Sequence, residues 1–83
     1  MRIRKQPVGD RNIVGSRVEQ ARKAQNMKQR ELLTKLQMKG IELNASGLSK
    51  LEGQLRCVND YELVALAEIL GVSIEWLVGK EEN

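Results

Sequence analysis

The residues best suited to bind another molecule lie in the run Asn-Ala-Ser-Gly-Leu-Ser-Lys from Asn44 to Lys50. Ser46 and Ser49 each carry a hydroxyl that can donate or accept a hydrogen bond, and Lys50 adds a long cationic side chain. Small residues at the start of a helix let its backbone approach a partner closely, and a lysine one turn later reaches further. The run therefore predicts a short helix whose first turns bind a polar or anionic surface.

Charge is distributed unevenly along the 83 residues. Residues 1–56 carry 13 Lys or Arg against 5 Asp or Glu, a net charge of +8, whereas residues 57–83 carry 1 basic and 6 acidic residues, a net charge of −5. Neutralisation of phosphates by Lys and Arg supplies much of the affinity of proteins for nucleic acids. The first part of the chain therefore has the charge of a polyanion-binding surface, although a chance excess of surface charge gives the same counts.

Groups that could catalyse a reaction are scarce. The chain has no His and a single Cys, Cys57, so it lacks a proton shuttle for neutral pH, an internal disulfide and a zinc ligand set. The serines have no base in a recognisable motif, and there is no Gly-rich phosphate loop. We expect a protein that is not an enzyme and uses no metal or cofactor, with Cys57 as a small apolar filler of the core.

The sequence also argues against a membrane protein. It has no run of 18 apolar residues, and its basic start, MRIRKQPVGD, is not followed by the apolar stretch and cleavage site of a secretory signal. These features favour the cytoplasm and, for a nucleic-acid-binding protein, the nucleoid.

Hydrophobic spacing predicts five helices and no substantial strand. The first is expected from Ile13 to Asn26, the second from Lys28 to a stop at Gly40, and the third over residues 45–52 behind Asn44 as N-cap. Residues 41–43 are expected to connect the second and third helices and to pack against the core. The apolar stripes that define these helices are Val14, Val18 and Ala21, then Leu32, Leu33 and Leu36, then Leu48 and Leu51.

Two further helices complete the expected domain. The fourth is capped by Asn59 or Asp60 and closed by Gly71, and the fifth, capped by Ser73, ends at Gly79. The organisation that follows is a basic N-terminal arm over residues 1–12, one domain over 13–79 and a polar tail over 80–83.

In order and spacing, these segments resemble the phage Cro and repressor (XRE-like) helix-turn-helix family. The first helix reads IVGSRVEQARKAQNM, the second opens MKQRELL and the third reads NASGLSKLE. The closing segment DYELVALAEILGVSIEWLVG is similar to that of the family almost residue for residue. The resemblance covers about residues 13–78.

The resemblance implies an all-α, compact five-helix bundle of the lambda repressor-like type, with the third helix in the major groove of DNA. It implies base readout by Ala45, Ser46 and Lys50, with Asn44, Gly47 and Ser49 beside them. It implies a phosphate contact for Gln29 at the start of the second helix. Further cations for phosphates or the minor groove are Lys28, Arg30 and Arg56, and in the arm Arg2, Arg4 and Lys5.

The sequence departs from the family pattern in the segment QMKGIEL, residues 37–43, which is about five residues longer than the compact family turn. Either the second helix gains a turn or the joint is a real loop, and this choice sets the angle between the two helices. Gly47 inside the third helix costs up to about 1 kcal/mol against Ala.

Several residues have a structural interpretation beside the functional one. Asn44 is expected to cap its helix whether or not it contacts DNA. Arg22 is expected to pair with an acidic residue, and Glu52 to bond to Arg56 or to a backbone N–H. Ser46, Ser49 and Lys50 could also be ordinary solvated residues.

The expected function is sequence-specific binding to double-stranded DNA and transcriptional regulation, most simply repression. A homodimer on DNA is expected, with Ile74, Trp76 and Leu77 as dimer residues, although Trp76 could equally cap its own core. The alternative is a protein-interaction or antitoxin-like module whose partner is a toxin or an antirepressor. RNA binding is disfavoured because aromatic residues for base stacking are scarce.

Overall fold

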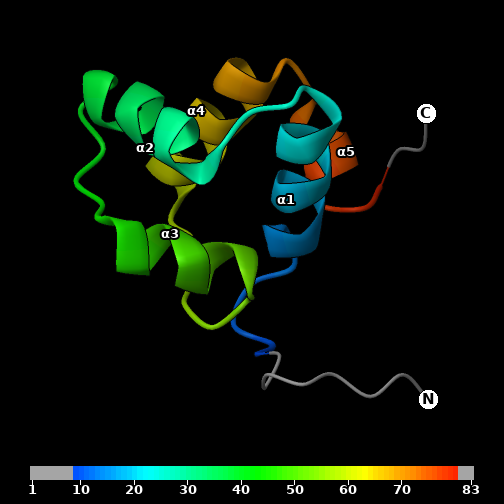
Figure 1. Cartoon of the computed structure of the whole chain (residues 1–83). Helices are drawn as coiled ribbons and strands as arrows, with labels where there is room; N and C mark the ends of the chain where they lie inside the picture. Colours follow the sequence, from blue (N-terminus) through cyan, green and yellow to red (C-terminus); the bar gives the residue numbers. More distant parts are fainter. Residues whose placement is uncertain (1–8, 81–83) are drawn as a thin grey trace.

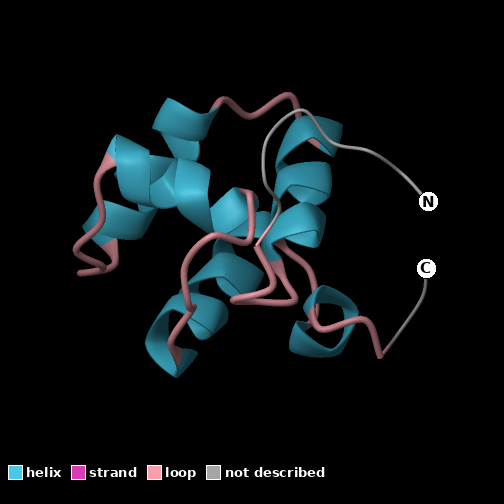
Figure 2. Ribbon diagram, turned by 90° about the horizontal axis from the view of Figure 1, so that it is seen from below, coloured by secondary structure: helices cyan, strands magenta, loops and turns pink. Residues whose placement is uncertain are grey.

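Five helices account for most of the chain in a computed structural model that describes residues 9–80 (Figure 1). They are α1 (Gly15–Ala24), α2 (Gln29–Met38), α3 (Ala45–Glu52), α4 (Asp60–Leu70) and α5 (Ile74–Leu77). Loops and turns join them, and no strand occurs within residues 9–80 (Figure 2). The expected all-helical architecture is confirmed, and none of the described helices is long and apolar enough to cross a membrane.

Side-chain caps fix the starts of three helices where the sequence predicts them. The side chain of Asn44 accepts a hydrogen bond from the Gly47 N–H at 2.7 Å, and that of Asn59 accepts one from Glu62 at 2.9 Å. At α5, Ser73 Oγ accepts from the Trp76 N–H at 3.0 Å. Each such cap contributes about 1 kcal/mol by satisfying an otherwise unpaired donor of the first turn.

One interior is shared by all five helices. α4 contacts α1, α2 and α5, whereas α3 packs mainly against α1 and α2 and leaves one side open to solvent (Figure 1). Seven side chains are almost fully buried: Val18, Leu32, Leu36, Leu48 and Leu51 from the predicted apolar stripes, with Leu66 of α4 and Leu77 of α5. The core therefore holds α3 by its inner face and presents its outer face.

The connector between α2 and α3 combines the two geometries that the sequence left open. α2 continues to Met38, and Gly40 then adopts a φ of +86°, a left-handed conformation that glycine tolerates. The chain continues as an extended loop in which Ile41 and Leu43 are half-buried against the core, as predicted. Gln37 Nε2 donates to the Leu43 carbonyl at 3.0 Å and ties the loop back to α2.

The start of the domain differs from the prediction. α1 begins at Gly15 rather than Ile13, whose side chain is 66% exposed. Residues 9–12, expected to belong to the basic N-terminal arm, lie along the loop after α3, and we call them the N-terminal strap. The Gly9 and Arg11 N–H groups donate to the carbonyls of Gly53 and Gln54 at 3.4 and 3.2 Å. A Cβ at Gly9 would overlap the Gln54 carbonyl oxygen, so this approach requires glycine.

Candidate nucleic-acid interface

The outer face of α3 carries most of the residues expected to read bases. Ala45, Ser46, Ser49 and Lys50 are all exposed, and Leu48, Leu51 and Glu52 point inward. Ser46 and Lys50, four residues apart, share the centre of the outer face because the α-helix repeats every 3.6 residues. Ala45 and Ser49 are likewise four residues apart and form the edge of this face nearest to α2. The structure thus brings four of the six predicted residues onto one accessible surface.

The two remaining residues of this group serve the helix itself. Asn44 is exposed, but its carboxamide oxygen is occupied as the N-cap. Gly47 is half-buried and faces the connector: a Cβ there would lie 2.8 Å from Leu43 Cδ1 and 3.1 Å from Asn44 Oδ1. Gly47 therefore leaves room for Leu43 and the cap beside α3.

The start of α2 lies beside the C-terminal half of α3. Gln29 Nε2 donates to Glu52 Oε1 at 2.9 Å, and Ser49 Oγ donates to Gln29 Oε1 at 3.3 Å. Lys28 and Arg30 flank Gln29, and both are exposed without an ion-pair partner among residues 9–80. The start of α2 thus places Gln29 against α3, with an exposed cation on either side of it in the sequence.

A buried ion pair supports this arrangement from below. Arg22 Nε and Nη2 donate to the two carboxylate oxygens of Glu52 at 2.7 and 3.0 Å, and Arg22 Nη1 donates to the Met27 carbonyl at 2.8 Å. The hydrogen bonds to Glu52 raise the pKa of the Arg22 guanidinium above its ordinary value, although burial opposes this shift. The expected acidic partner of Arg22 is confirmed, and the only carboxylate of α3 is turned away from solvent.

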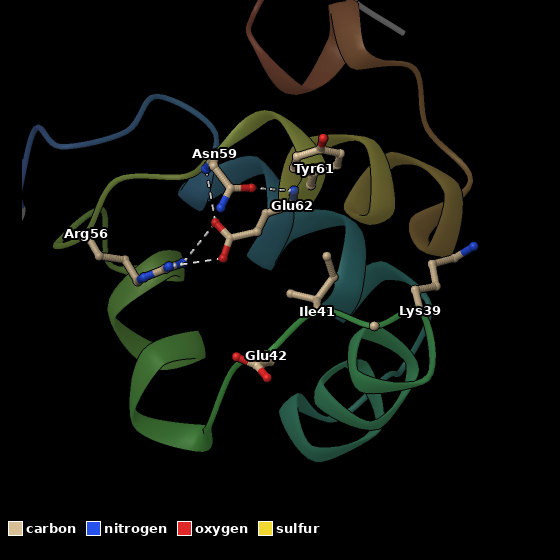
Figure 3. Close-up of a pocket in the computed structure, with 8 residues that line it drawn as sticks. Lys39, Ile41, Glu42, Arg56, Asn59, Tyr61 and Glu62 are labelled. Atoms are coloured by element: carbon tan, nitrogen blue, oxygen red, sulfur yellow. Dashed lines mark hydrogen bonds and ion pairs between the residues drawn. The ribbon is translucent and has the colours of Figure 1, made fainter.

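Arg56 is engaged differently from the prediction. It does not bond to Glu52; its Nη1 and Nη2 donate to the two oxygens of Glu62 at 3.3 and 3.0 Å (Figure 3). The same carboxylate accepts from the Asn59 N–H at 3.0 Å, which completes a capping box for α4. Arg56 is half-buried in this pair, so its guanidinium is less available for phosphates than those of exposed residues.

Asn12 is the functional-site neighbour that the sequence reasoning missed. Its Oδ1 accepts from the N–H groups of Val14 and Gly15 at 3.1 and 2.8 Å, and its Nδ2 donates to the Leu51 and Arg56 carbonyls at 3.1 and 2.8 Å. Asn12 therefore joins the start of α1 to both sides of the α3 C-terminus. An Asn before an apolar-periodic segment is a cap signal, but its long-range partners leave no trace in the local sequence.

The strap also fixes where the arm joins the domain. Arg2, Arg4 and Lys5 lie outside the described residues. Residue 9, which follows them, is bonded to Gly53 at the end of α3. Residue 9 therefore lies beside the end of α3, the helix expected to enter the major groove.

The expected dimer residues are divided by burial. Leu77 is fully buried and Trp76 is only 6% exposed, whereas Ile74 is 38% exposed. The Arg17 guanidinium lies 4.9 Å from the centroid of the Trp76 ring and donates to the Trp76 carbonyl at 3.0 Å. Trp76 and Leu77 thus belong to the chain's own core: this is the second of the two places expected for Trp76, it corrects Leu77 as a partner-facing residue, and it leaves Ile74 on the surface.

Cys57 is exposed, so its expected place in the core is wrong. It lies in the loop before α4, where the Arg56–Glu62 pair and the capping box fix the neighbouring backbone. Within residues 9–80 no group of three or more His, Cys, Asp or Glu residues is placed to hold a metal ion.

Comparison of the chain with protein-family models, curated proteins and solved structures finds no match. The helix-turn-helix relationship therefore stays a prediction from the residue pattern.

Proposed function

We propose that this protein binds double-stranded DNA sequence-specifically, with α3 in the major groove. The observation that carries the proposal is the outer face of α3: an exposed surface with two hydroxyls and one lysine, next to the start of α2, where exposed Lys28 and Arg30 flank Gln29 in the sequence. An α-helix fits the major groove of DNA, and side chains from its first turns reach base edges.

Electrostatics support the same orientation. Lys28, Arg30 and Lys50 are exposed without salt bridges to other described residues, so their charges are available to phosphates. Glu52, which would repel DNA, is buried and paired with Arg22. Glu31 stays exposed in the first turn of α2, where its carboxylate accepts from the Lys28 N–H. Lys28, Arg30 and Lys50 thus outnumber the exposed carboxylates of Glu31 and Glu42 near α3, whereas α4 and α5 carry the acidic residues Asp60, Glu62, Glu68 and Glu75.

The arrangement fits a lambda repressor-like helix-turn-helix in which α2 and α3 form the motif. Such domains commonly act as two-fold symmetric dimers, so we propose a homodimer on DNA that represses transcription by blocking polymerase. This role would place the protein with the nucleoid in the cytoplasm.

A salt titration of binding to a random-sequence duplex pool tests the proposal. The logarithm of the association constant should fall linearly with the logarithm of salt concentration, because each neutralised phosphate releases counterions. Selection of bound duplexes from the pool should then return a motif. Absence of binding even at low ionic strength would exclude the DNA function, and a reporter that is activated from the selected site would exclude repression.

A groove beside α4 favours a second candidate function, a protein-interaction or antitoxin-like module. Two adjoining pockets of about 560 and 610 Å³ share Lys39, Ile41 and Tyr61 in their lining, and Figure 3 shows the first of them. The second also includes Val64. Tyr61 and Val64 are exposed apolar residues on the outer side of α4. A toxin or antirepressor bound there would be lost in Tyr61→Ala and retained in Lys50→Ala, the reverse of the pattern expected for DNA.

A further inference from the structure

Four side chains form a continuous chain of hydrogen bonds from the interior to the outer edge of α3. Arg22 donates to Glu52, Glu52 Oε1 accepts from Gln29 Nε2 at 2.9 Å, and Gln29 Oε1 accepts from Ser49 Oγ at 3.3 Å. The first two side chains are buried, Gln29 is half-buried and Ser49 is exposed.

In this series of hydrogen bonds, the buried Glu52 carboxylate decides which group donates and which accepts at each step. Glu52 takes three N–H donors on its two oxygens, so it acts only as an acceptor. The Gln29 amide must therefore turn its nitrogen to Glu52 and its oxygen to Ser49. An amide oxygen cannot donate, so the contact with Ser49 requires the serine O–H as donor.

The consequence lies on the solvent side of Ser49. A serine hydroxyl has one hydrogen and two lone pairs, and the hydrogen is directed to Gln29. The lone pairs stay available on the exposed face that Ser49 shares with Ala45, one helical turn earlier. Ser46 differs, because no described residue holds its hydroxyl and it can rotate to donate or accept.

Building on the DNA-binding function proposed above, we infer that Ser49 meets DNA as a hydrogen-bond acceptor and selects one chemical class of base. In the major groove, adenine and cytosine present amino donors, whereas guanine and thymine present keto oxygens at the corresponding position. Ser49 therefore favours an amino base over a keto base on the strand that it faces. Gln29 is the positioning residue that sets this polarity.

Selection from a random duplex library, repeated with variants, tests the inference. The wild-type motif should contain one position with an amino base preferred about 3- to 10-fold, the discrimination expected of one net hydrogen bond. Ser49→Ala should remove the preference at that position. Gln29→Ala should also weaken it, because the released hydroxyl can then donate to a keto base. Ser46→Ala is the matched control and should alter a different position.

A double variant separates positioning from a general loss of affinity. In a Ser49→Ala background, Gln29→Ala should have no further effect on the amino-to-keto ratio, although it can still lower affinity for every site. Gln29→Met, which keeps the aliphatic stem but offers no amide oxygen, should behave as Gln29→Ala does. Thermal unfolding of each variant verifies that the fold is retained.

The outcomes distinguish this inference from the proposed function. A wild-type motif whose Ser49-dependent position prefers guanine or thymine would overturn the inference, as would an amino preference that survives in both Gln29 variants or a Ser49→Ala motif identical to that of the wild type. In each of these cases DNA binding itself stands. A wild-type protein that enriches no motif would overturn both.

Discussion

Arg22 of α1 and Glu52 of α3 meet in the interior through two parallel hydrogen bonds, with Nε and Oε2 2.7 Å apart. The pair joins the two helices across 30 residues of sequence. A planar guanidinium matches a carboxylate in this two-point geometry, which a lysine cannot reproduce. Because Glu52 also accepts a hydrogen bond from Gln29, the pair holds the start of α2 against α3 on the buried side of the candidate interface.

Removal of Glu52 should destabilise the domain strongly. Glu52→Ala leaves the Arg22 guanidinium buried without its partner and should lower the free energy of unfolding by about 3–5 kcal/mol. Glu19→Ala, which breaks the exposed pair with Lys23, should cost no more than about 0.5 kcal/mol. Urea unfolding of both variants measures the contrast, and equal losses would mean that the buried pair contributes nothing specific.

The same variant gives a pH prediction. The pKa of Arg22 is raised in the folded state, so its contribution is present below the unfolded-state pKa and is lost only as the pH rises through the folded pKa. The stability difference between the wild type and Glu52→Ala should therefore stay constant between about pH 6 and 9. If the stability difference between the two proteins decreases as the pH changes within this window, another titrating group controls the pair.

Lys50→Ala should change the preferred DNA sequence. A lysine at the centre of the α3 face can donate to guanine O6 and N7, and loss of such a contact costs about 1–3 kcal/mol at one base-pair position. Lys80→Ala removes an exposed lysine beyond α5 and should leave the motif unchanged. Competition binding with single-base operator variants measures the effect. A uniform loss across all variants would assign Lys50 to phosphate instead.

Lys28→Ala should weaken binding without changing specificity. Lys28 precedes α2 and has no salt-bridge partner among the described residues, so it is free to neutralise one phosphate. The slope of log K against log salt should become less negative by about 1, and the affinity ratio between specific and random duplexes should stay the same. Lys23→Ala, on a residue that already pairs with Glu19, is the control. An unchanged slope in Lys28→Ala would remove Lys28 from the interface.

Asn12→Ala should destabilise the junction of the strap, α1 and α3. It removes four hydrogen bonds and leaves the Leu51 and Arg56 carbonyls without this donor, at an expected cost of about 2–3 kcal/mol. Ser16→Ala, at an exposed position nearby, should stay within about 0.5 kcal/mol of the wild type. Thermal or urea unfolding compares the two, and similar stabilities would show that the four bonds are replaced by water without cost.

Trp76 should report folding rather than assembly. Because its ring is buried between the helices and Arg17, Trp76→Ala should cost about 3–5 kcal/mol, and the fluorescence of the single tryptophan should change on unfolding but not on dilution.

Ile74→Asp changes an exposed residue and should leave the monomer folded while weakening a dimer formed through this end. Sedimentation at several concentrations measures the latter, and an unaffected dimer would place the interface elsewhere.

Local features of this protein were readable from its residues. The caps at Asn44, Asn59 and Ser73 and the turn at Gly71 follow from hydrogen bonds and backbone angles within three or four residues. The apolar stripes of α1, α2 and α3 follow from helical periodicity, because one face of each helix must be apolar to reach the core. The sequence alone therefore determined the number, type and approximate limits of the helices and which side of α3 is presented.

The tertiary structure decided which side chains meet. Arg22 and Glu52, Gln29 and Ser49, and Asn12 and Leu51 at the end of α3 are separated by 20 to 39 residues, and no local pattern encodes such contacts. Cys57 is exposed although a core position was expected, and Trp76 takes the core position that was one of its two expected places, since burial depends on what packs above a residue and not on its type alone. The polarity of Ser49 is the furthest consequence, because the hydrogen of an exposed hydroxyl is directed by a carboxylate buried two side chains away.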